Sequence, residues 1–290
     1  MTRRLWLLAL AVALAFVSSS VALAADDVEI KPDLIYGHKD GMALTMDLLR
    51  PANPNGAAVL FLQSGGWYSA WREPAQLVPA ARPLLDKGFT VLIVYHGSAP
   101  RFQVPDAVAD VRRAVRYVHW KADELKIDPA RIGVLGGSAG GHLSLMLATT
   151  GDDGDPAAKE EILKYPSRIA AAVALYPPTD LRKWTTDPPK AIAAVPGLKP
   201  PLSFPAEKEA DVSPILFVSD KAAPSLMIHG DKDELVPIEH SQKLHAALQE
   251  KKAVSELLTI EGAAHGYNAE HNKRVIPAMV GWFEKHLAKP

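Results

Sequence analysis

Short runs of apolar residues alternate along this chain with segments in which apolar residues recur at helical spacing. The apolar runs are residues 57–65, 89–96, 131–137, 169–177, 224–230 and 255–262. Such continuous runs are typical of strands that are covered on both faces, as in a parallel sheet. Valines recur at helical spacing from position 104 to 118, and residues 238–252 and 274–287 show a similar apolar period. Strands that alternate with helices predict an α/β fold with a mostly parallel central sheet and helices on both faces.

Two segments depart from this alternation. Residues 33–51 predict a pair of strands around a turn at 39–41, because apolar residues alternate at strand period from position 44 to 48. Residues 182–214 contain seven prolines and little periodicity, which indicates a small cap insertion rather than another strand and helix. The chain shows no internal repeat and no second core. One domain from residue 25 to 290 is therefore predicted.

The N-terminus has the composition of an export signal. Arg3 and Arg4 precede an apolar run from Leu5 to Val17, three serines follow, and Ala22-Leu23-Ala24 resembles a cleavage site. This order predicts a signal peptide over residues 1–24 and a periplasmic or secreted protein, without stable membrane insertion once the signal is removed. An uncleaved membrane anchor is the alternative, because the stretch after Arg4 carries no charge until Asp26.

Composition narrows the functional classes. The 290 residues are 48% hydrophobic and 22% charged, with a formal net charge of −1 and no clustered Lys or Arg. A globular protein without a nucleic-acid surface is expected, acting on small molecules. The chain has no cysteine, so disulfides, a thiolate nucleophile and thiolate metal ligands are excluded.

One pentapeptide joins a predicted strand to a predicted helix. Residues 136–140, Gly-Gly-Ser-Ala-Gly, match G-x-S-x-G and lie between the apolar run 131–137 and an apolar segment from His142 onward. In this motif the glycines permit a sharp turn that exposes the serine above the sheet. Ser138 is therefore the candidate nucleophile. A phosphate-binding turn is the alternative, but neither the P-loop ending nor the G-x-G-x-x-G spacing is present.

A nucleophilic serine needs a base, and the base needs an acid, which in this motif class follow in the order Ser, Asp or Glu, His. The run 224–230 is followed by Asp231, Asp233 and Glu234, and the last run is followed by His265. Because the carboxyl ends of parallel strands share one edge of a sheet, these groups should converge on Ser138. We predict Asp233 as the acid, with Asp231 as its main rival, and His265 as the base. The spacing of His229 and these acids matches no familiar metal site.

Acyl transfer also requires backbone N–H groups that bind the oxyanion. Ala139, the residue after the nucleophile, is one expected donor. The others are expected from the loop after the run 57–65, at Ser64, Gly65 and Gly66. Trp67 and Tyr68 follow this loop and Trp184 lies in the predicted cap, so all three are candidate substrate-binding residues; the competing interpretation is that they are ordinary core aromatics.

Three ordered motifs carry a resemblance to a known family. "GGSAGGHLSLMLA" resembles the nucleophile turn, "HGDKDELVP" the acid loop and "GAAHGY" the histidine loop of α/β-hydrolases of the esterase branch. That branch includes hormone-sensitive-lipase-like, feruloyl-esterase-like and kynurenine-formamidase-like enzymes. The resemblance covers essentially the whole chain after residue 24 and implies the α/β-hydrolase fold, with Ser138, Asp233 and His265 as a catalytic triad.

The loop expected to bind the oxyanion departs from that family. Related loops read His-Gly-Gly-Gly or a close variant, whereas this chain has Gln63 and Ser64 in place of the histidine and the first glycine. If position 64 required a positive φ, serine would cost on the order of 1 kcal/mol there. Backbone donors are independent of the side chain, so the loop is still expected to supply N–H groups.

The resulting hypothesis is an exported serine carboxylesterase that hydrolyses small esters through an acyl-enzyme, without a cofactor or a metal. Two alternatives stay open on the sequence. One is a peptidase or amidase that uses the same triad. The other is a non-catalytic binding protein that retains the hydrolase fold.

Overall fold

Eight strands form one mixed sheet in the computed structural model, which describes residues 27–289. The strands are β1 (Val28–Lys39), β2 (Met42–Pro51), β3 (Ala58–Leu62), β4 (Thr90–Val94), β5 (Ile132–Gly137), β6 (Ala171–Leu175), β7 (Ser225–Gly230) and β8 (Ser255–Ile260). Their spatial order is β1-β2-β4-β3-β5-β6-β7-β8. β2 pairs antiparallel with both β1 and β4, and every other pair is parallel. The predicted mostly parallel α/β sheet is confirmed.

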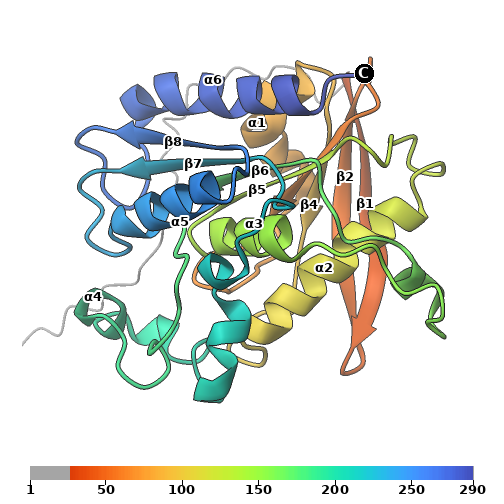
Figure 1. Cartoon of the computed structure of the whole chain (residues 1–290). Helices are drawn as coiled ribbons and strands as arrows, with labels where there is room; N and C mark the ends of the chain where they lie inside the picture. The colour runs from red at the N-terminus through yellow and green to blue at the C-terminus, as the bar shows by residue number, and fades with distance from the viewer. Residues whose placement is uncertain (1–26, 290) are drawn as a thin grey trace, which may run out of the picture.

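Helices cover both faces of this sheet (Figure 1). They are α1 (Pro74–Leu85), α2 (Val104–Trp120), α3 (Ala139–Thr150), α4 (Lys190–Ala193), α5 (Glu239–Glu250) and α6 (Ala269–His286). Buried residues of α1 and α6 belong to one core cluster, whereas those of α2 and most of those of α3 belong to another. Leu145 of α3 and two leucines of α5 complete a third, smaller cluster. α1 carries Pro79 and Pro83, and the apolar pattern of the sequence did not predict it.

The strands separate these cores because successive side chains point to opposite faces. On β3, Leu60 and Leu62 pack with α2 and α3, whereas Val59 packs with α1 and α6. On β4, Leu92 lies on the first face and Val91 on the second. Continuous apolar runs are therefore required, since both faces of each central strand exclude water.

Residues 182–214 fold into α4 and short 3-10 helices, η3 (Pro196–Leu198), η4 (Ala206–Lys208) and η5 (Ala210–Val212). Apolar side chains from the segment join the core of α2 and α3; they are Trp184, Ile192, Leu202, Phe204 and Val212. The backbone N–H of Val104, at the start of α2, donates to the Pro201 carbonyl at 3.1 Å. The segment is therefore anchored on the helix layer that contains α2 and α3.

The predicted signal peptide over residues 1–24 lies outside the described residues. Within residues 27–289, no helix is both long enough and apolar enough to cross a membrane.

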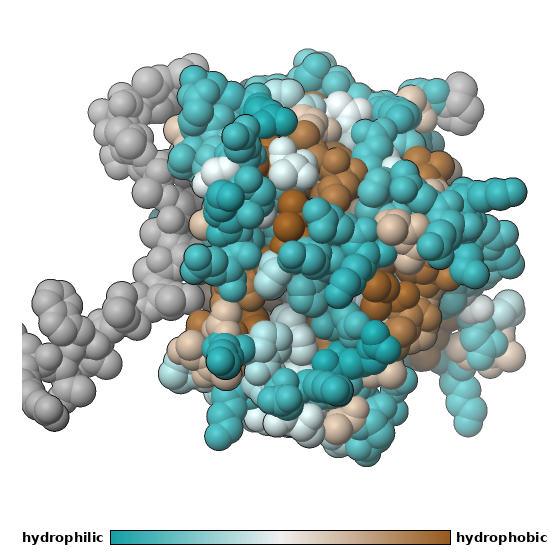
Figure 2. All heavy atoms as spheres, turned by 60° about the vertical axis from the view of Figure 1, so that its left-hand side comes forward, coloured by the Kyte–Doolittle hydropathy of each residue, from teal (hydrophilic) through white to brown (hydrophobic). Residues whose placement is uncertain are grey.

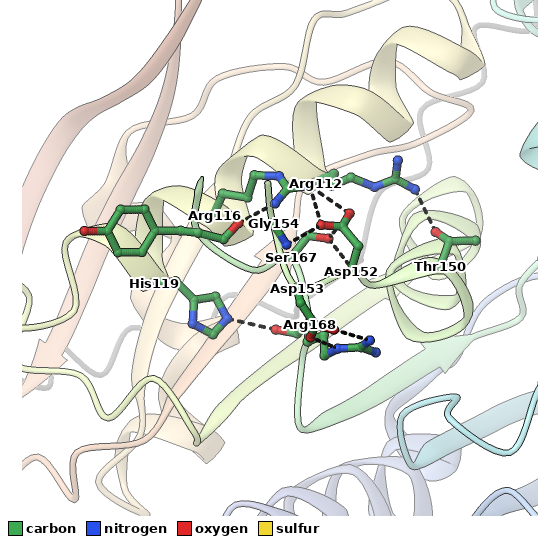
Figure 3. Close-up of polar contacts among 10 residues, drawn as sticks. Arg112, Arg116, His119, Thr150, Asp152, Asp153, Gly154, Ser167 and Arg168 are labelled. Atoms are coloured by element: carbon green, nitrogen blue, oxygen red, sulfur yellow. Dashed lines mark hydrogen bonds and ion pairs between the residues drawn. The ribbon is translucent and has the colours of Figure 1, made fainter. Parts of the chain in front are cut away.

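A polar network holds the end of α3 and the loop that follows it against α2 (Figure 3). Arg116 of α2 donates to both carboxylate oxygens of Asp152, at 2.6 and 2.7 Å, and also to the Tyr165 carbonyl. The hydroxyl of Ser167 donates to Asp152 at 2.9 Å. Arg112, one turn earlier on α2, donates to the Thr150 hydroxyl at 2.8 Å. Because α3 begins at the residue after Ser138, this network fixes the far end of the helix that follows the candidate nucleophile.

We expect Arg116→Met to lower the free energy of unfolding by about 2 kcal/mol, because it removes hydrogen bonds to a charged group. Arg182→Met is the matched control. Arg182 makes a similar pair with Asp180, but its side chain is 55% exposed, so about 0–1 kcal/mol is expected there. Urea denaturation of both variants measures the difference. Equal losses would contradict a structural role for the Arg116 network.

Candidate active site

Ser138 lies at the turn between β5 and α3, with φ 53° and ψ −117°. A serine rarely adopts this backbone conformation, and it persists only where the surrounding structure imposes it. Here the Ser138 N–H donates to the Leu175 carbonyl at 2.8 Å, and the Ser138 carbonyl accepts the N–H of His142 at 2.9 Å. The side chain is therefore held at the turn by bonds on both sides of its own residue.

Two glycines of the motif permit close backbone approach. A Cβ on Gly136 would lie 2.3 Å from the carbonyl carbon of Gly140, and a Cβ on Gly140 would lie 2.7 Å from the Leu62 carbonyl oxygen. Both distances are far below contact distance between such atoms. The first turn of α3 therefore packs directly on the ends of β5 and β3, and the glycines permit the sharp turn between β5 and α3.

The three predicted triad residues lie in one chain of hydrogen bonds. Ser138 Oγ is 2.8 Å from His265 Nε2, and His265 Nδ1 is 2.7 Å from Asp233 Oδ2. Since a carboxylate only accepts, Nδ1 carries the proton and Nε2 accepts the serine hydroxyl. Each residue follows the end of a different parallel strand: β5, β7 or β8. The arrangement allows His265 to remove the proton of Ser138.

The surroundings of Asp233 distinguish it from Asp231. Its Oδ1 accepts the N–H groups of Leu235 and Val236, at 3.0 and 2.9 Å, and its Oδ2 lies 3.2 Å from Nε2 of the buried His229. Burial opposes ionisation, but the hydrogen bonds from His229 and His265 hold the pKa of Asp233 well below its usual range. Asp231 instead accepts the Gly262 N–H at 2.6 Å. Asp231 therefore stabilises a turn, and Asp233 is the carboxylate that contacts His265.

The loop after β3 lies against the nucleophile turn. The Ser64 carbonyl accepts the Gly140 N–H at 3.3 Å, and Gly65 and Tyr68 exchange two backbone hydrogen bonds of 3.0 Å. The Gly65 N–H is therefore occupied, which corrects the expectation that it is a free oxyanion donor. The N–H groups of Ser64, Gly66 and Ala139 have no acceptor within residues 27–289, so they are the available donors.

The strain expected at position 64 lies elsewhere in the loop. Positive φ values occur at Gly66, 56°, and at Trp67, 60°, but not at Ser64. Serine therefore carries no left-handed backbone penalty at position 64. The left-handed conformation is costly for a bulky residue such as tryptophan, so other contacts must hold Trp67.

Those contacts come from α3 and from the segment 182–214. The Trp67 Nε1–H donates to His142 Nδ1 at 3.2 Å, and the other ring nitrogen of His142 donates to the Val212 carbonyl at 2.7 Å. The rings of Trp67 and Trp184 meet edge to face at 6.5 Å. Trp67 is 3% exposed and Trp184 5%, so the structure favours the core interpretation of both over substrate binding. Tyr68 is half-buried and stays a candidate for substrate contact.

The sequence analysis missed two aromatic residues at the site. The Tyr176 ring lies 4.7 Å from the His265 ring and 5.2 Å from the Tyr267 ring. Burial and the nearby charge of Asp233 raise the pKa of Tyr176 to about 12, so its hydroxyl stays protonated. Tyr176 directly follows the end of β6. That position was a usable signal, because the other site residues also follow strand ends.

The mixed sheet and this serine, histidine and aspartate arrangement define an α/β-hydrolase of the esterase and lipase branch. Residues 46–248 match the BD-FAE family, and the chain belongs to that family. Within residues 27–289, no group of three or more His, Asp or Glu side chains is arranged to hold a metal ion.

Several relatives of the chain are named as esterases or ester hydrolases. The chain is 30% identical over 72% of its length to the probable carboxylic ester hydrolase LipM of Mycobacterium tuberculosis, and 28% identical over 84% to esterase LipC of that organism. It covers 49% and 61% of those proteins, so it spans only about half to three fifths of the length of these relatives. Esterase 2 of Thermogutta terrifontis phosphonylated by sarin has a TM-score of 0.75 and 26% identity, over 91% of this chain and 98% of that one.

Protonation of His142 should make stability depend on pH. Burial lowers the pKa of His142 to about 4, against about 6.5 in an unfolded chain. Between these values the unfolded chain binds a proton that the folded chain excludes. The free energy of unfolding should therefore decline as the pH falls from about 6.5 to 4, by up to about 1.4 kcal/mol per pH unit.

Urea denaturation between pH 7.5 and 4.5 measures this slope. His142→Gln should reduce it, whereas the same change at the exposed His38 should leave it unaltered. His240, whose pKa burial lowers to about 4, and His96, whose pKa burial also lowers, contribute to a remaining slope of the same sign. An unchanged slope in His142→Gln would mean that this imidazole is protonated in the folded protein.

Proposed function

We propose that this protein is a serine carboxylesterase that hydrolyses small carboxylic esters. The observation that carries the proposal is the continuous hydrogen-bonded chain from Ser138 through His265 to the buried Asp233. The esterase relatives and the BD-FAE match support the same reaction class.

The geometry accounts for each step of an acyl transfer. Ser138 Oγ attacks the ester carbonyl carbon while His265 Nε2 takes its proton, and the ionised Asp233 stabilises the imidazolium. The oxyanion that develops is expected to bind the N–H groups of Ser64, Gly66 and Ala139, which have no acceptor within residues 27–289. His265 then gives the proton to the leaving alcohol, and a water molecule that it activates releases the acid and regenerates Ser138.

The surface near the sheet's carboxyl edge favours small soluble esters over a lipid interface. Figure 2 brings forward the side of the molecule on which β7 and β8 end, and this face is mostly hydrophilic, with apolar residues in separate patches. An enzyme that works on a lipid surface needs a larger continuous apolar area. The segment 182–214 also restricts space beside the loop, because Leu198 packs against Gly66.

Hydrolysis of p-nitrophenyl esters with two to twelve acyl carbons tests the function. The native protein should favour short chains, and Ser138→Ala should abolish turnover. Asp233→Asn should lower kcat by about 10⁴-fold, because His265 then loses its carboxylate partner. Asp231→Asn is the matched control and should retain most activity, since the Asp231 carboxylate bonds the Gly262 turn and not His265.

Turnover that persists in Ser138→Ala would overturn the mechanism. A protein that shows no turnover, and in which Ser138 is not labelled by a fluorophosphonate, would favour the non-catalytic interpretation. Cleavage of p-nitroanilides in preference to esters would favour the amidase interpretation.

We also propose that the chain is exported and cut after Ala24, on the strength of the basic, apolar and Ala-Leu-Ala segments within residues 1–24. When the full chain is expressed in a bacterium with an outer membrane, fractionation should recover it from the periplasm or medium, and intact-mass measurement should give a chain that begins at Ala25. Ala24→Asp should block cleavage while leaving the apolar segment intact. Native protein found in the cytoplasm at full length would contradict export.

A further inference from the structure

We propose that His96 and Ser64 form a positioning pair that holds the oxyanion loop against the nucleophile, an inference that rests on the proposed function. Ser64 Oγ lies 2.8 Å from His96 Nε2. His96 follows the end of β4 and is 4% exposed. The pair therefore joins the loop after β3 to the end of the neighbouring parallel strand.

The partners of His96 fix its tautomer. His96 Nδ1 lies 2.8 Å from the Gly97 carbonyl oxygen, which can only accept. Nδ1 therefore carries the proton, Nε2 accepts, and the Ser64 hydroxyl donates to it. Burial lowers the pKa of His96, which keeps the ring in the neutral form that can accept this bond.

Two charged residues hold the backbone next to His96. The Gly97 N–H donates to Asp110 Oδ2 at 2.9 Å, and Lys39 contacts Asp110 Oδ1 at 3.0 Å. Asp110 lies on α2 and Lys39 on β1. The backbone next to the His96 imidazole is thus held by contacts from α2 and β1, so the imidazole can hold Ser64 at a defined position.

Ser64 transmits this position to the nucleophile turn. Its side chain bonds His96, while its carbonyl accepts the N–H of Gly140, two residues after Ser138. Its own N–H is one of the available oxyanion donors. A glycine at position 64, as in the related His-Gly-Gly-Gly loops, has no side chain with which to make the first of these contacts. The serine that replaces glycine at position 64 therefore has a hydrogen-bonding partner in His96.

The expected consequence is catalytic rather than merely structural. Oxyanion donors act through preorganisation, and a misplacement of about 1 Å can cost on the order of 10²-fold in rate. Ser64→Ala keeps the backbone N–H and removes only the hydroxyl. Loss of the Ser64–His96 hydrogen bond should therefore lower kcat roughly tenfold, which is less than the cost of losing an oxyanion donor outright. KM should stay within about twofold, because this hydrogen bond does not contact the ester in the ground state.

A double-mutant cycle on Ser64→Ala and His96→Asn tests the pair, with kcat and KM measured on a short p-nitrophenyl ester. The Asn amide can still donate towards the Gly97 carbonyl, but it does not reach Ser64. Each single variant should lose about the same factor in kcat, and the double variant should lose no more than either. His96→Gln places an amide oxygen near the position of Nε2 and should recover part of the loss.

The chain offers a matched control pair. His245 on α5 and Ser255 on β8 are bonded at 2.8 Å, and neither contacts the loop or the nucleophile turn. His245→Asn and Ser255→Ala should leave kcat unchanged. Thermal unfolding of every variant separates a loss of rate from a loss of folded protein, and the kinetics are measured well below the lowest Tm. Ser64→Gly provides a second variant that lacks the hydroxyl.

The outcomes separate the two hypotheses. Native protein without Ser138-dependent turnover would overturn the proposed function and this inference with it. Native protein that is active, with Ser64→Ala and Ser64→Gly at full kcat, would overturn the positioning pair alone. Losses in kcat that multiply in the double variant, or losses confined to KM, would also overturn the positioning pair alone. Matching losses in kcat that do not multiply, with partial recovery in His96→Gln, would establish the pair.

Discussion

The strained backbone at Ser138 is the constraint on which the rest of the site depends. A serine at φ 53° and ψ −117° is held only because β5 and α3 continue in regular structure immediately before and after it. That continuation requires the approach of Gly140 to Gly136 and to the Leu62 carbonyl, which any side chain at these glycines would prevent. The parallel sheet thus fixes the nucleophile, and the loops at its carboxyl edge need only bring partners to a point that is already defined.

Those loops are held in part by buried imidazoles that share one bonding pattern. His96, His142 and His229 each direct one ring nitrogen to a backbone carbonyl, of Gly97, Val212 and Val236 respectively. The other ring nitrogen contacts a side chain: Ser64 for His96, Trp67 for His142 and Ser241 for His229. At His96 and His142, whose pKa burial lowers, the neutral imidazole suits this task, because it is rigid and offers one donor and one acceptor, whereas an unpaired buried charge would be costly.

Much of the fold could be predicted from the sequence, because continuous apolar runs and helical periods reflect burial directly. The cores on either side of Leu60 and Val59 follow from the period of two in a strand. Helix α1 was not predicted, because two internal prolines are more typical of a loop than of a helix. The site was predictable as far as motifs imposed local geometry, which is why Ser138 and His265 could be singled out. Tertiary contacts decided the rest: Asp231 and Asp233 are both acids after the same strand, and they differ in their partners, the Gly262 turn for Asp231 and His265 for Asp233.

The loop after β3 shows why a departure from a motif cannot be interpreted position by position. In the sequence, Ser64 replaces the first glycine of the related loops, which suggests a cost in backbone conformational energy at that position. In the structure the left-handed backbone conformation occurs at Trp67, whose side chain bonds His142 of α3. Ser64 instead forms a hydrogen bond with His96. Both histidines are distant from the loop in sequence, so neither could be connected with it from local pattern. The geometry of an oxyanion loop is therefore a property of the contacts around it, and a substitution within it is interpretable only together with the residues that meet it.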